Sequence, residues 1–167
     1  MALTQSTLAS GLESLTPTSS EPVAISAFVD AFETYWNGAT VSGAGLNPGT
    51  IDTGLAAMQG AMAGLSVTGQ GATKIAAGVS AFWSAQAALA TTMWTTAPIV
   101  LVPPIVPPAG LSGLAAALSS TFASNLAGEL SLTDAAAALA ATIHAANLGG
   151  VVPGSAPPAA PAPIPIL

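Results

Sequence analysis

The sequence is poor in groups that carry charge or bind metals. Its 167 residues include no cysteine, one histidine, seven acidic residues and Lys74 as the sole lysine or arginine. A single cation cannot neutralise several phosphates, so we expect no nucleic-acid partner, and the same scarcity excludes basic attachment to an anionic lipid surface. The absence of cysteine excludes disulfides, thiolate metal sites and thiol catalysis.

The composition is apolar, which is the opposite of a disordered chain. Charged residues make up 5 % of the sequence and hydrophobic residues 51 %, with a mean hydropathy of +0.70. Disordered chains combine low hydrophobicity with high charge, and soluble surfaces usually carry about 25–35 % charged residues. The surface of this protein is therefore expected to lie against lipid or against other protein subunits.

The membrane alternative depends on the charge-free stretch Ile75–Gly128. A spanning helix needs about 20 mostly apolar residues. The best window is Ile75–Thr95, which is largely alanine interrupted by serine, threonine and glutamine. Alanine and threonine insert weakly into a bilayer compared with leucine, isoleucine or phenylalanine. The prolines between 98 and 108 break any second spanning helix. Met1–Gln5 has no positively charged region, so we expect no Sec signal peptide. We therefore expect the surface of this protein to contact other protein subunits. The alternative is that the chain is a membrane-associated helical protein that contacts lipid through 72–95.

Apolar residues recur at helical spacing through most of the chain. The segments that show this spacing are 4–15, 21–37, 51–65, 72–94, 111–127 and 134–147. We expect Asn47-Pro48 to cap the third of these helices and Thr133-Asp134 the last. Gly60 and Gly64 favour close approach by another helix. The sequence predicts a mostly α fold, a single small bundle of five or six short helices.

Two proline-rich segments interrupt this pattern. They predict an extended connector at 95–110 within a helical domain of residues 1–150, followed by an extended C-terminal arm at 151–167. A long apolar strand exposed on a monomer would aggregate, and proline lowers the entropy cost of ordering an arm on a neighbour. We therefore expect these segments to contact other subunits. The predicted interface residues are Ile99, Val100, Leu101, Val102, Ile105, Ile164, Ile166 and Leu167.

The residues that could carry chemistry are few and badly placed. As a general base, His144 would act with Asp134 and a serine such as Ser131, but His144 is ten residues from Asp134 on one predicted helix, on a different face. Asp30 and Glu33 form the nearest approach to a carboxylate pair, and a solvated helix face explains them better than a metal or acid–base site. We predict no catalytic, cofactor-binding or metal-binding residues.

Three family resemblances bear on function. Trp36-Asn37-Gly38 resembles the helix-turn element of small secreted WXG100 proteins, and the alanine- and glycine-rich composition is similar to that of PE/PPE proteins, although the N-terminus lacks their Pro-Glu or Pro-Pro-Glu start. The stretches Tyr35–Leu65 and Thr142–Gly150, with the proline tail that follows, look like small structural proteins of tailed phages and phage-tail-like particles.

The phage resemblance is compositional and carries over no functional residue. It implies a non-enzymatic structural subunit whose partners are other protein subunits, in a homo- or hetero-oligomer. The expected location is a virion or an extracellular or cytoplasmic particle. A secreted WXG100-like or PE/PPE-like protein is a further alternative.

Overall fold

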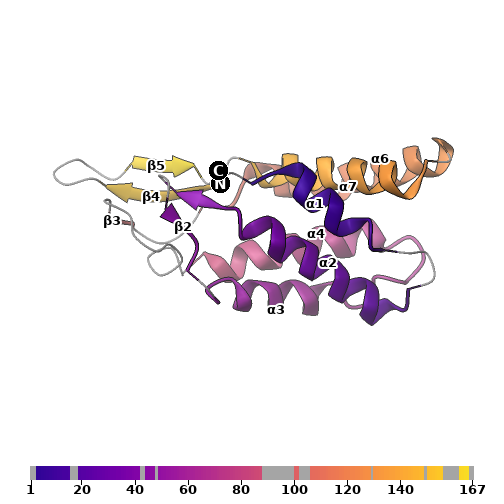
Figure 1. Cartoon of the computed structure of the whole chain (residues 1–167), viewed down its shortest axis with the longest axis horizontal. Helices are drawn as coiled ribbons and strands as arrows, with labels where there is room; N and C mark the ends of the chain where they lie inside the picture. The colour runs from indigo at the N-terminus through magenta and orange to yellow at the C-terminus, as the bar shows by residue number, and fades with distance from the viewer. Residues whose placement is uncertain are drawn as a thin grey trace.

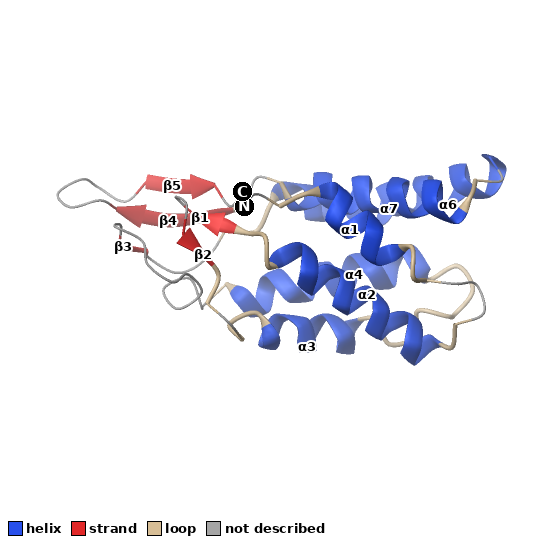
Figure 2. Ribbon diagram, viewed as in Figure 1, coloured by secondary structure: helices blue, strands red, loops and turns tan. Residues whose placement is uncertain are grey.

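Six α-helices form a bundle in the part of the chain that the structure describes, and the short strands lie at one end of it (Figures 1 and 2). The computed structural model describes residues 3–15, 19–41, 44–47, 49–87, 100–101, 106–128, 130–148, 150–155 and 162–165. The helices are α1 (Gln5–Leu12), α2 (Glu21–Trp36), α3 (Asp52–Ala61), α4 (Gly71–Gln86), α6 (Leu114–Gly128), preceded by the 3-10 helix η1 (Ala109–Gly113), and α7 (Leu132–Asn147). The predicted small helical bundle is confirmed.

The strands form two small antiparallel sheets. One pairs β1 (Thr40–Val41) with β2 (Ala44–Gly45). The other has the order β3-β4-β5, with bounds β3 (Val100–Leu101), β4 (Val151–Ser155) and β5 (Ala162–Pro165).

No helix among the described residues is long and apolar enough to cross a membrane.

An aromatic cluster between α2 and α4 makes up the centre of the core. The ring centroids of Phe32 and Phe82 lie 5.1 Å apart, those of Trp36 and Phe82 4.9 Å, and those of Trp36 and Trp83 5.1 Å. Each of these side chains buries about 150–250 Å². Because seven of the other buried hydrophobic residues are alanines, which bury little surface each, this cluster supplies a large share of the apolar burial.

Glycines allow the helices to approach closely, although not at the predicted positions. A Cβ atom on Gly11 would lie 2.5 Å from the Cβ of Ala31 on α2. One on Gly54 would clash with the Phe82 ring on α4. The expectation for Gly60 is wrong, because Gly60 is exposed and has no neighbour within 4 Å of its Cβ position. Gly64 lies outside α3 in a turn, with a φ of +86°.

Two of the predicted helix starts are also corrected. The helix predicted to follow Asn47-Pro48 begins instead at Asp52, with Ile51 as its N-cap. The last helix is capped by Ser131 and not by Thr133, because the Ser131 hydroxyl accepts a hydrogen bond from the Asp134 N–H, three residues on.

Two helix ends differ as well. The third helix stops at Ala61 and not at 65, since the glycines that follow favour turns over helix. The helix predicted over 72–94 is described as far as Gln86, and 88–99 lies outside the described residues.

Gln86 is a polar residue on the otherwise apolar buried face of α4. Its side chain is buried, and its Nε2 donates a hydrogen bond to the carbonyl of Ile51 at 3.2 Å.

Candidate functional site

The two proline-rich segments pair with each other inside one chain. Val100 lies opposite Ser155 and Leu101 opposite Gly154, so the connector is hydrogen-bonded to the start of the predicted arm. β4 then pairs with β5, where Ile164 lies opposite Val152. The arm is extended where it is described, and so is the connector at Val100–Leu101, but the prediction of an extended connector up to 110 is wrong at its end, because Ala109 and Gly110 belong to η1. Five of the predicted interface residues lie outside the described residues: Ile99, Val102, Ile105, Ile166 and Leu167.

The outer edge of β5 has no backbone donors at its prolines. Pro153 lies opposite Pro163, and since neither has an N–H, the two must form a non-hydrogen-bonded pair. Pairs alternate along an antiparallel ladder, so the backbone groups of Pro163 and Pro165 both face away from β4. A further strand therefore finds no N–H to pair with at these positions.

The end of the bundle far from the strands exposes large apolar side chains. The α1–α2, α3–α4 and α6–α7 connections all lie at this end (Figure 1). Leu126 has 83 % of its surface exposed. We call this surface the distal end, and its exposed apolar residues are Val23, Val67, Leu126, Leu130 and Leu132. Of the exposed large hydrophobic residues that the structure describes, only Val106 and Leu148 lie elsewhere.

An apolar hollow of about 220 Å³ opens at the distal end. We call it the distal hollow, and it is lined by Leu12, Leu15, Phe122, Asn125, Leu132, Ala135, Ala136 and Leu139. These residues come from α1 and the segment after it, from α6 and from α7. Small-molecule pockets usually begin at about 300 Å³, so the distal hollow suits one or two protein side chains better than a cofactor.

Sequence reasoning placed the interface on the proline-rich segments and missed the leucines of the distal end. Leu126 follows Phe122 at helical spacing, and this pattern indicates burial. Leu126 is exposed in the structure because α1 ends at Leu12. α1 packs beside the part of the α6–α7 hairpin that is nearer the strands and does not reach the α6–α7 connection (Figure 1). The sequence feature that could have indicated this surface is the presence of three leucines, Leu126, Leu130 and Leu132, around the short connection between α6 and α7.

A carboxylate holds the α3–α4 connection at the same end. Glu21, the first residue of α2, accepts hydrogen bonds from the N–H of Gly64 at 2.9 Å, the N–H of Ser66 at 3.0 Å and the Ser66 hydroxyl. These bonds, with a smaller contribution from the charge of Lys74, hold the pKa of Glu21 below its ordinary value. Glu21 therefore fastens the connection to α2.

His144 is paired with a buried phenol. Its Nδ1 lies 2.8 Å from the Tyr35 hydroxyl, and the two rings meet edge to face at 5.8 Å. Burial lowers the pKa of His144 and raises that of Tyr35. Ser131 Oγ donates to Asp134 Oδ2 at 2.6 Å at the start of α7, about 15 Å along the helix from His144 at 1.5 Å per residue. The structure thus keeps His144 apart from Asp134 and Ser131.

The acidic residues that the structure describes do not gather into a metal site. Asp30 is exposed and Glu33 half-buried on α2. Within the described residues there is no group of three or more histidine, cysteine, aspartate or glutamate side chains that could hold a metal ion.

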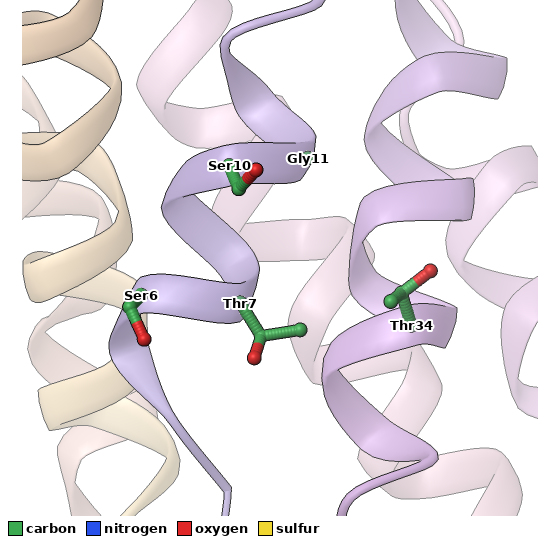
Figure 3. Close-up of a pocket in the computed structure, with 5 residues that line it drawn as sticks. All are labelled: Ser6, Thr7, Ser10, Gly11 and Thr34. Carbon is green, nitrogen blue, oxygen red and sulfur yellow. The ribbon is translucent and has the colours of Figure 1, made fainter.

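A shallow hollow of about 460 Å³ lies between α1 and α2 and is lined by hydroxyl groups (Figure 3). Figure 3 shows Ser6, Thr7 and Ser10 on α1 and Thr34 on α2. The Thr34 hydroxyl donates to the carbonyl of Asp30 at 2.9 Å, and that of Thr7 lies 2.6 Å from the Thr4 hydroxyl. None of its lining residues is charged, so the hollow lacks a base to activate a hydroxyl.

Comparisons with protein-family models, curated proteins and solved structures found no match for this chain.

Proposed function

We propose that this chain is a non-enzymatic structural subunit of a large protein assembly, a phage virion or phage-like particle. The observation that carries the proposal is the distal end, where five large apolar side chains are exposed on a protein with 5 % charged residues. Monomeric proteins rarely expose clustered apolar residues, and such clusters mark interaction sites. Burial against neighbours would stabilise the assembly by about 25 cal/mol per Å² of apolar surface.

The proline-rich sheet is a second contact region in this proposal. Because the backbone groups of Pro163 and Pro165 face the outer edge of β5, a neighbour would not extend the sheet by adding a strand at these positions of that edge. The predicted interface residues on the connector and the arm keep this role, and their partners are other protein subunits.

The alternatives have less support in the described part of the chain. Among the described residues no helix is long and apolar enough to cross a membrane, and of the stretch 72–95 the structure describes 72–87. A WXG100-like hairpin places its motif between two long helices, whereas here the Trp36-Asn37-Gly38 motif is followed by the β1–β2 hairpin.

Sedimentation tests the proposal. We expect antibodies against the chain to detect it in the particle fraction of its native source, and we expect the purified chain to form species larger than 16.0 kDa at micromolar concentration. A variant that lacks 157–167 should enter particles less well. The control keeps the arm but carries Ala159→Ser and Ala160→Ser. A stable monomer that is absent from the particle fraction would contradict the proposal.

A further inference from the structure

We infer that the distal hollow is the docking site for an amphipathic helix with basic residues beside its apolar stripe, carried by a protein other than this chain. The inference rests on the proposed function and specifies one contact of the assembly. It follows from the shape, the lining and the surrounding charge of the distal end.

The lining of the distal hollow fits apolar side chains. Its walls are leucine, phenylalanine and alanine from three parts of the bundle, with Asn125 as the polar exception. Leu132 lines the hollow and is itself exposed, and the exposed residues Leu126 and Leu130 precede it at the end of α6 and in the α6–α7 connection. A helix that inserts one or two large side chains into the hollow can therefore cover the exposed leucines with the next turns of its stripe.

The acidic residues near the distal hollow favour a partner helix that carries basic residues. Glu13 directly follows the lining residue Leu12, Asp134 directly precedes the lining residue Ala135, and both acids are exposed. Lys74 lies elsewhere at this end, beside Gly64 and Glu21. None of the residues that line the hollow is basic. A partner with lysine or arginine at the margins of its stripe is complementary to this rim.

The same charges disfavour a second copy of this chain as the occupant. A two-fold contact brings the same surface of both subunits together. It would bring two surfaces that both carry Glu13 and Asp134 together, on a chain of net charge −6 with one lysine to offset them. Juxtaposed like charges weaken an interface, so the occupant is assigned to a different, basic protein.

Designed peptides test this assignment on the full chain. The probe is a fluorescently labelled amphipathic helix with leucines at i, i+3, i+4 and i+7 and lysines at the margins of the stripe. A twin peptide has glutamates in place of the lysines, and a second has glutamines in place of the leucines. We expect saturable binding of the lysine peptide by fluorescence anisotropy, at least about five-fold weaker binding of the glutamate twin, and no binding of the glutamine peptide.

Substitutions locate the binding surface. Leu126→Ser with Leu130→Ser should weaken binding of the lysine peptide by about ten-fold or more, and both residues are exposed enough for the fold to persist. The control is Leu148→Ser, which changes an exposed leucine at the other end of α7. Glu13→Lys should weaken binding about two- to five-fold, whereas Asp30→Lys on α2 should leave it unchanged.

In the peptide assay, the inference would be overturned by no binding of the lysine peptide, by equal binding of its glutamate twin, or by equal loss with Leu148→Ser. A dimer in sedimentation that Leu126→Ser with Leu130→Ser converts to monomer would also overturn it, because the occupant would then be a second copy. Each of these failures leaves the particle-fraction result intact, and so each is distinct from failure of the proposed function.

Discussion

At the scale of the residue, the packing of this protein depends on small side chains at helix crossings. Gly11 and Gly78 both face another helix at a distance that leaves no room for a methyl group. What differs is the neighbour: Gly11 meets the Cβ and Cα of Ala31, while Gly78 meets the side chain of Met62. Backbone cannot move aside, whereas a methionine side chain adapts readily.

Three glycine-to-alanine variants should therefore differ in sign and size. Gly11→Ala should lower the free energy of unfolding by about 1–3 kcal/mol, and Gly78→Ala by less. Gly60→Ala should raise it by about 0.5–1 kcal/mol, because Gly60 lies in α3 with open space around it. Denaturant titration measures all three, and equal effects of Gly11→Ala and Gly60→Ala would contradict the packing argument.

A buried polar pair makes a second residue-scale prediction. Trp83 Nε1 donates to Asn147 Oδ1 at 2.7 Å, and Asn147 Nδ2 donates to the carbonyl of Ile143 at 2.8 Å. Asn147→Ala would leave the indole N–H buried without a partner, at a cost of about 1–3 kcal/mol in unfolding free energy. Asn37→Ala, at an exposed position, serves as the control. A loss no larger than that of the control would show that the pair contributes little.

At the scale of the element, the bond network of Glu21 ties the start of α2 to the connection between α3 and α4. Since the folded protein lowers the pKa of this carboxyl from 4.5, the ionised form is favoured by folding. The stability that it contributes is present above pH 4.5 and is lost as the pH falls through the lower folded value.

Glu21→Gln should thus reduce Tm at pH 7, and the difference from the wild type should shrink as the pH falls below about 4.5. Thermal unfolding followed by circular dichroism at a series of pH values measures this. Asp30→Asn, which changes an exposed acid on the same helix, is the control. A Tm difference that stays constant down to pH 3 would show that the charge of the Glu21 carboxylate does not stabilise its hydrogen bonds to the α3–α4 connection.

Helix positions were predictable from the sequence and helix ends were less so. The spacing of Ile25, Phe28, Phe32 and Trp36 located α2, because one helical face must be apolar to reach the core. The end of α3 and the turns after it could not be located in this way, since they depend on contacts with Glu21, which is distant in sequence. Periodicity shows which face is apolar but not whether another element covers it, so the exposure of Leu126 was missed.

At the scale of the whole molecule, the two ends of the bundle differ in the contacts they offer. The strand end pairs the connector with the arm and presents prolines at its outer edge. The distal end presents leucines around a hollow. A subunit with contact regions at opposite ends can join two different neighbours at once, which suits the proposed place in an assembly.

The uneven distribution of aromatic side chains sets the order in which the protein opens to solvent. α2 buries seven residues, most of them large, whereas α6 buries Leu114 and Leu118. Segments with little buried apolar contact open locally at lower free energy. Amide hydrogens of α6 should therefore exchange with deuterium before those of α2 and α4, as mass spectrometry of peptic fragments would show. Because α6 also carries Leu126 of the distal end, a docked partner would be seen as slower exchange in a segment that otherwise opens before α2 and α4.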